Sequence, residues 1–199
     1  MPRKVDHQQR RLVIIKALLV FAAREGMHRV SLRQIASEAG ISLRLVQYYF
    51  DSKADLMQAG LDYLEQRSHR LWSARIAQLP QPLSATDTLA AFVATALPLD
   101  QQSREFQLLW TSFAMLALTD ETISNRAFVD GPTRLQEQLT AIIQSAIDNA
   151  EFSSNLHAEQ EAQCLMALVH GLGAALLVGQ QTASQAKANI TAYLARLSA

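Results

Sequence analysis

The sequence predicts an all-α fold, in which an N-terminal three-helix head with a helix-turn-helix precedes a C-terminal helical body. Apolar residues recur at spacings of three and four along nearly the whole chain, which is the period of an amphipathic helix. The alternation typical of strands is almost absent. Glycine, proline and capping residues interrupt the pattern at helix-length intervals.

The chain has 199 residues, of which 49% are apolar and 18% charged, as is typical of a globular protein with a sizeable core. Disordered and fibrous classes are excluded, because no stretch is rich in proline and glycine or low in complexity. Cys164 is the single cysteine, which excludes a disulfide framework and a cysteine-based zinc site. We expect Cys164 to be a small buried apolar residue in a reducing compartment.

The expected helices cover about residues 8–24, 32–38, 43–49, 53–79, 86–97, 101–118, 121–128, 132–150, 158–180 and 183–197. They are separated by Gly26, Gly40, Asp51-Ser52, Pro80-Gln81-Pro82, Pro98, Thr119-Asp120, Gly131-Pro132 and Ser153-Ser154-Asn155, and each break offers a glycine, a proline or a capping side chain. The head is assigned to residues 1–53 and the body to residues 54–199.

Two apolar stretches of the chain superficially resemble a signal peptide and a membrane span. The first helix has Lys16 inside its apolar stretch and apolar residues at helical spacing, so it predicts an amphipathic core helix rather than a signal peptide. The stretch from Cys164 to Val178 is shorter than the roughly 20 residues that span a bilayer. We therefore expect a soluble cytoplasmic protein without a membrane partner.

The net charge of zero hides an asymmetry between the two parts. The head carries ten Lys and Arg against four Asp and Glu, a net charge of +6, and the body carries eight against fourteen, a net charge of −6. A basic segment alone is often only a solvated face. Joined to an acidic body, it indicates an anionic partner that only the head engages.

The segment from Ser31 to Asp55 predicts a helix-turn-helix. Ser31 and Gln34 have the spacing of a capping box, which starts a short helix. Gly40 can adopt the left-handed conformation that ends this helix, and Ser42 can cap a second one. Burial of Val46 turns the second helix back onto the first. Two short helices joined in this way place the second one in the major groove of DNA.

The outer face of the second helix carries groups that can read double-stranded DNA. Arg44 can bind a guanine edge with two hydrogen bonds, and Gln47 can bind adenine in the same way. Tyr49 can donate to a phosphate. The helix starts at Ser42 and at Ser52-Lys53 offer free N–H groups to anions. The plain alternative is a helical hairpin with solvated polar residues.

The stretch SLRQIASEAGISLRLVQYYFDSKADL resembles the DNA-binding signature of the TetR family of bacterial transcriptional regulators, and the resemblance covers about residues 8–56. It implies that Arg33, Arg44 and Gln47 face base edges or nearby phosphates. It also implies phosphate contacts from Ser31, Ser42, Tyr48, Tyr49 and Lys53, and Leu43 can reach thymine methyl groups. Many family members have a small residue or proline at position 44 and tyrosine at position 47, so the operator sequence stays open.

The same resemblance implies a C-terminal domain that binds a small-molecule effector and forms a homodimer. The segment CLMALVHGLGAALLVGQQ is similar to the C-terminal domain of the choline-responsive BetI-like branch. That branch often has Asp-Gly-Leu where this chain has His170-Gly171-Leu172, so choline is not carried over.

The residues themselves also favour a dimer through the helices near 132–150 and 158–180. The first has a wide apolar stripe, which includes Leu139 and Ile143. The second is apolar on nearly all sides and contains Gly171 and Gly173, each of which costs about 1 kcal/mol in a helix and so indicates close packing. A core within one chain is the alternative.

Aromatic and polar residues on neighbouring helices predict an effector pocket. The candidates are Phe92, Phe106, Trp110, Phe113, Met166 and His170. The alternative is that this group is core, and His170 is equally well explained as a core histidine. Apolar walls favour a mostly apolar effector with one or two hydrogen-bonding groups, and a quaternary ammonium over Trp110 ranks second.

No pattern in the chain predicts catalysis, a cofactor or a metal site. A glycine-rich phosphate loop, a GxSxG motif and a metal-binding histidine spacing are all missing. Cys164 and His170 project in different directions from one helix, so they do not form a catalytic pair. The alternative to a DNA-binding regulator is therefore a helical ligand-binding or interaction module whose head does not bind specific DNA.

Overall fold

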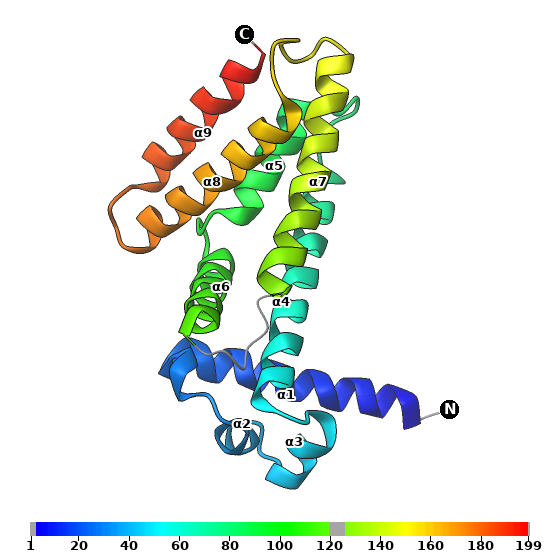
Figure 1. Cartoon of the computed structure of the whole chain (residues 1–199), viewed down its shortest axis with the longest axis vertical. Helices are drawn as coiled ribbons and strands as arrows, with labels where there is room; N and C mark the ends of the chain where they lie inside the picture. Colours follow the sequence, from blue (N-terminus) through cyan, green and yellow to red (C-terminus); the bar gives the residue numbers. More distant parts are fainter. Residues whose placement is uncertain (1–2, 120–125, 199) are drawn as a thin grey trace. The chain divides into compact units, whose positions relative to one another are not determined.

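The computed structural model describes residues 3–119 and 126–198, with side chains described from residue 7 except at 117, 119 and 126–130. All regular elements in these ranges are helical, which confirms the predicted fold class (Figure 1). They are α1 (Arg3–Glu25), the 3-10 turn η1 (Met27–Arg29), α2 (Leu32–Glu38), α3 (Leu43–Tyr49), α4 (Lys53–Ile76), α5 (Ala85–Ala96), α6 (Gln101–Thr119), α7 (Arg126–Asp148), α8 (Ala158–Leu177) and α9 (Ala183–Leu197).

The described residues pack as two compact units. The head unit contains the chain up to Gln66 and the part of α6 from Leu108. The body unit contains Arg67–Gln107 and the later helices. Long helices α4 and α6 each contribute to both units. This division follows packing alone, so the predicted domain boundary after residue 53 stays a prediction.

The short helices of the head begin and end at the residues that the sequence indicated. The Ser31 hydroxyl accepts from the Gln34 backbone N–H at 3.3 Å and donates to the Gln34 side-chain oxygen at 2.8 Å. Gly40 adopts φ 65°, a left-handed conformation that favours glycine. The Ser42 hydroxyl accepts from the Leu45 backbone N–H at 3.2 Å and caps α3.

The core of the head unit fixes how α3 is turned. Val46 and Phe50 are fully buried, together with Ile35 of α2 and Leu56 of α4. Tyr48, by contrast, is 67% exposed. The helix therefore has one buried line and one exposed surface.

The body unit is built around an apolar cluster from α4, α5, α7, α8 and α9, which includes Trp72, Phe92, Leu139, Ile143 and Leu165. In Figure 1, α8 and α9 lie side by side as an antiparallel pair. Polar groups fasten this pair along one edge. The Tyr193 hydroxyl donates to the Glu161 carboxylate at 2.7 Å, and Arg196 donates to the same oxygen at 2.9 Å. Burial and the Glu161 carboxylate raise the pKa of Tyr193 well above its usual value.

Three sequence expectations need correction. Helix α7 begins at Arg126 and continues through Pro132, so the predicted break at Gly131-Pro132 and the start at 132 were wrong. Proline has a helical φ, so a helix can contain it, although it removes one backbone hydrogen bond and its ring crowds the carbonyl four residues earlier. Cys164 is exposed rather than buried, because it faces away from the core side of α8. Helix α1 begins at Arg3, earlier than expected.

One predicted helix lies partly outside the described residues. Of the predicted helix 121–128, residues 121–125 lie outside the described residues, and residues 126–128 belong to α7. Along the described chain, no helix is both long and apolar enough to cross a membrane.

Replacing Phe50 should destabilise the head far more than replacing its exposed neighbour. Phe50→Ala removes a fully buried ring and should lower the free energy of unfolding by about 3–5 kcal/mol. Tyr48→Ala, the matched control, should lower it by less than about 1 kcal/mol, because a mostly exposed side chain contributes little. Urea denaturation followed by circular dichroism measures both. Equal losses would contradict the assigned orientation of α3.

Candidate DNA-binding site and body cavity

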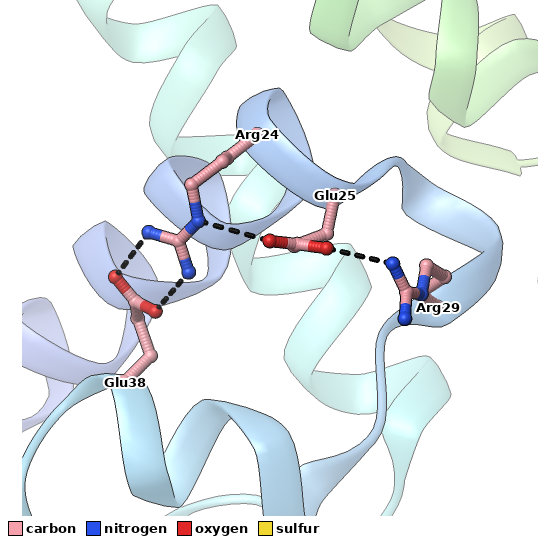
Figure 2. A network of polar contacts seen from close by, with 4 residues as sticks. All are labelled: Arg24, Glu25, Arg29 and Glu38. Carbon is pink, nitrogen blue, oxygen red and sulfur yellow. Dashed lines mark hydrogen bonds and ion pairs between the residues drawn. The ribbon is translucent and has the colours of Figure 1, made fainter.

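A polar network fastens α1 to α2 and so positions the helix-turn-helix. The Arg24 guanidinium donates to both oxygens of Glu38, at 3.1 and 2.6 Å, and also to Glu25 (Figure 2). Glu25 accepts in turn from Arg29 at 2.7 Å. The hydrogen bonds from Arg24 lower the pKa of Glu38, and the two glutamates raise the pKa of Arg24. The network joins the end of α1 to the last turn of α2.

The predicted DNA-contacting residues differ in exposure, and none of them is fully buried. Arg33, Ser42, Arg44, Gln47 and Tyr48 are exposed, and Ser31, Leu43, Tyr49 and Lys53 are half-buried. Val46 and Phe50 occupy the opposite, buried line of α3. The motif can therefore present two long polar side chains of α3 to a groove while its apolar residues stay covered.

The end of α3 is held by residues of α1 that sequence reasoning missed. Arg11 donates to the backbone oxygen of Tyr49 at 3.0 Å, and its guanidinium lies 4.4 Å from the ring centroid of Phe50. His7 completes an aromatic cluster, with ring centroids 5.8 Å from Tyr48 and 5.5 Å from Tyr49. His7 and Arg11 are four residues apart and so lie on one face of their helix, and this spacing is the sequence pattern that could have indicated a shared contact surface.

The start of α4 is capped next to Lys53. The Ser52 hydroxyl accepts from the Asp55 backbone N–H at 3.0 Å, and the Asp55 carboxylate accepts from the Asp51 backbone N–H at 3.3 Å. Lys53 is half-buried in the first turn, one residue after the cap.

The six candidate effector residues lie in different surroundings. Phe92 and Met166 belong to or pack against the body core, where Phe92 meets Trp72 edge-on with ring centroids 5.6 Å apart. His170 is on the exposed side of α8, although neighbouring atoms desolvate its ring enough to lower the pKa. Phe113 is fully buried in the head unit, and Trp110, half-buried, precedes it in the same unit. Assembly of all six into one pocket stays a prediction.

Phe106 lines a cavity of about 110 Å³ in the body unit, between α4, α5 and α6. Its other walls include Arg67, Leu71 and Arg75 of α4 and Asp100 at the start of α6. Backbone and hydroxyl hydrogen bonds from Ser103 lower the pKa of Asp100. Sequence reasoning missed both arginines, although their spacing of four from Leu71 marks one helix face.

Comparison with known proteins decides the family. Residues 85–199, more than half of the chain, match a family model described as a BetI-type transcriptional repressor, C-terminal, and residues 14–59 match one described as bacterial regulatory proteins, tetR family. The chain belongs to the TetR family of bacterial transcriptional regulators. It has a BetI-like C-terminal region and is a DNA-binding regulator.

Individual relatives agree with this assignment. The transcriptional regulator BetI of Serratia proteamaculans is 29% identical over 86% of this chain and 83% of its own length. A TetR-family regulator from Rhodococcus sp. has the same fold, with a TM-score of 0.85 and 22% identity over 96% of this chain and all of its own. A regulator from Saccharomonospora viridis, solved in complex with choline, gives a TM-score of 0.83 and 22% identity over 94% of this chain and 96% of its own.

The tetR family model covers the helix-turn-helix. Residues 14–59 span most of α1, all of α2 and α3, and the first turns of α4. The partners of the TetR family are operator DNA, a small-molecule effector and a second copy of the chain. Catalysis is not known in this family. Within the described ranges, no group of three His, Cys, Asp or Glu side chains could hold a metal ion.

Acid should weaken the link between α1 and α2. Because Arg24 lowers the pKa of Glu38, the link stabilises the head fully above the ordinary glutamate pKa of 4.5 and is lost as pH falls through the lowered value. The melting temperature of the wild type should therefore fall below about pH 4.5 more steeply than that of Glu38→Gln. Thermal unfolding between pH 3 and 7 measures the difference. Parallel curves for the wild type and Glu38→Gln would contradict the role of this ion pair. Asp62→Asn, which removes a carboxylate outside the network, is the control and should follow the wild-type curve.

Proposed function

We propose that this regulator is a cytoplasmic homodimeric repressor that leaves a palindromic operator when a small molecule binds its body. The exposed polar surface of α3 is the observation that carries the proposal. It combines Arg44 and Gln47, the two residue types best suited to guanine and adenine edges, on a helix whose opposite side is buried. In a dimer, two such helices can enter successive major grooves of one operator.

Each DNA-contacting residue has a proposed role. Arg33, Arg44 and Gln47 face base edges or nearby phosphates, and Leu43 contacts thymine methyl groups. Phosphates are contacted by Ser31, Ser42, Tyr48, Tyr49 and Lys53. Support comes from the exposure of Arg33, Ser42, Arg44, Gln47 and Tyr48 and from the capped helix starts at Ser31, Ser42 and Ser52, because the N-terminus of a helix favours an anion.

Arg44 and Lys53 should affect binding in different ways. Arg44→Ala should remove discrimination at one operator position and cost about 1–3 kcal/mol on the preferred sequence. Lys53→Ala should weaken binding to all sequences similarly and flatten the dependence of affinity on salt concentration. Fluorescence anisotropy on captured genomic fragments and on single-base variants measures both effects.

The control for this pair is Lys187→Gln, which removes a positive charge from the exposed side of α9 and should leave DNA affinity unchanged. If Arg44→Ala kept both its affinity and its sequence preference, α3 would not be the recognition helix.

The dimer interface is proposed on α8 and α9. The apolar stripe of α7, which suggested 132–150, is already covered by the chain itself, since Leu139 and Ile143 are fully buried. Gly173 packs against Gln107 of the same unit, where an added Cβ would lie 3.4 Å from its side-chain nitrogen. Gly171, in contrast, has open space around it.

The free side of α8 is lined by small residues that permit close approach of another helix. Cys164, Ala167, Gly171 and Ala174 follow each other at spacings of three and four, and all are exposed. The neighbouring helix α9 also exposes small residues, at Ala188, Ala192 and Ala195. Two copies can therefore pack α8 and α9 together as a four-helix arrangement.

Ala167→Glu should split the dimer without unfolding the chain. The side chain is exposed in the single chain but would be buried in the proposed interface, where an unpaired charge is costly. Ala90→Glu makes the same change on an exposed site of α5 and should leave the dimer intact. Analytical ultracentrifugation at micromolar concentration compares the three proteins. A monomeric wild type, or a dimeric Ala167→Glu, would overturn the proposed interface.

The proposed switch runs through α4, which passes without a break from the body unit into the head unit. An effector that binds two arrangements of the body with different affinity would shift this helix and change the spacing of the two heads. A mostly apolar effector bound within the body is the first candidate. A quaternary ammonium ranks second, and the choline complex of the Saccharomonospora viridis regulator supports it.

The competing function is a helical ligand-binding module whose head does not bind specific DNA. Electrophoretic mobility shift on DNA flanking the chain's own gene separates the two. Specific retardation that salt weakens supports the repressor, and equal binding to all sequences supports the module.

A further inference from the structure

The cavity between α4, α5 and α6 is large enough for a small organic molecule. Its volume is about 110 Å³, and all of its walls belong to the body unit. A water molecule needs roughly 10–15 Å³ of such space, so the cavity holds about seven to eleven water-sized groups. That is the size of a compact molecule with one ring or a short chain.

Two arginines of α4 line this cavity. Arg67 and Arg75 are eight residues apart, so they lie on the same helix face with Leu71 between them. With the Gln102 amide oriented so that its oxygen faces Arg67, this oxygen accepts from Nη2 at 2.6 Å and from Nε at 3.1 Å. The neutral amide of Gln102 thus occupies the two N–H donors of Arg67 that would otherwise suit the two oxygens of a carboxylate.

The charges of the walls do not cancel. Among the described residues that line the cavity, Asp100 is the one carboxylate, and it already accepts from the Ser103 N–H at 2.7 Å and from the Ser103 hydroxyl at 2.9 Å. In the described part of the chain, neither Arg67 nor Arg75 lies within 4.0 Å of a carboxylate oxygen. The walls therefore carry a net charge of +1, although residues 54–199 as a whole carry −6.

The remaining walls combine the apolar side chains of Leu71, Ala94 and Phe106 with the hydroxyl groups of Ser68 and Thr95. Beside the two arginines, Leu71, which is 40% exposed, offers an aliphatic surface, and Phe106 offers a flat aromatic one. Such a site has a place for one negative charge and another for a short hydrocarbon body. A cation such as choline does not fit it, because two guanidinium groups would repel a like charge.

We propose that this cavity binds a small organic carboxylate, with the carboxylate held by Arg67 and Arg75 and the apolar body held against Leu71 and Phe106. Binding displaces the Gln102 oxygen from Arg67, which then forms two parallel hydrogen bonds to the ligand. The assignment rests on the proposed function and deepens it, since it gives the effector of this regulator a chemical class.

Tryptophan emission offers a direct readout. Trp72 directly follows Leu71 on α4, and its buried indole N–H meets no acceptor among the described residues. The chain has two tryptophans, so Trp110→Phe leaves Trp72 as the reporter. Benzoate is the probe, benzamide is its neutral isostere, choline tests a cation, and inorganic phosphate tests a charge without an apolar body.

In the full-length Trp110→Phe protein, benzoate should bind at least tenfold more tightly than each of the other three compounds. Arg67→Gln and Arg75→Gln should each weaken benzoate at least tenfold, whereas Lys187→Gln, which removes the same charge elsewhere in the body, should change nothing. Circular dichroism melting checks that each variant is folded, and Arg75→Lys, which keeps the charge, should retain more affinity than Arg75→Gln.

Equal binding of benzoate and benzamide, or benzoate affinity that both arginine variants retain, would overturn the carboxylate site. Tighter binding of choline or phosphate would overturn it as well. Mobility shift with captured operator DNA tests the repressor separately. If Arg75→Gln still binds the operator without benzoate but is no longer released by it, both the site and the switch are supported. Benzoate binding by a protein that never binds specific DNA would overturn the proposed function but leave the carboxylate site in place.

Discussion

The burial of Val46 and Phe50 is the constraint on which the rest of the head depends. Both side chains are fully covered, so α3 can take only one rotation about its axis. That rotation exposes Arg44 and Gln47 together. Gly40, with its left-handed backbone, and the Ser42 cap make the short turn that allows α3 to reach this position. The polar surface that we propose to face DNA therefore follows from apolar packing on the opposite side of the same helix.

Local signals made the head predictable from sequence. Ser31, Gly40 and Ser42 each act on neighbouring residues, so their effects can be read from spacing alone, and α2 and α3 begin and end at the predicted residues. Contacts distant in sequence were missed. The Arg11 bond to Tyr49 and the Arg24 bond to Glu38 join residues 38 and 14 positions apart, and a spacing along one helix does not show which distant residue a side chain on that face will meet.

The body was harder to predict, because an apolar helix face can be covered either by the core of the same chain or by a partner. Periodicity identified the stripe with Leu139 and Ile143, but it could not tell a core of the same chain from a surface that a partner covers. Cys164 shows the same limit, since a small residue on a mostly apolar helix faces outward there. Aromatic residues drew attention to Phe106, yet Arg67 and Arg75 give its cavity a positive charge.

The central claim is that the head of this TetR-family regulator recognises specific DNA through α3. Capture of genomic fragments by the purified chain, followed by sequencing and hydroxyl-radical footprinting, tests it most directly. We expect a small set of fragments with a two-fold symmetric footprint, whose two halves are about one helical turn of DNA apart. A double variant, Arg44→Ala with Gln47→Ala, should capture none of them selectively. Random fragments without a shared footprint, or the same fragments captured by the double variant, would contradict the claim.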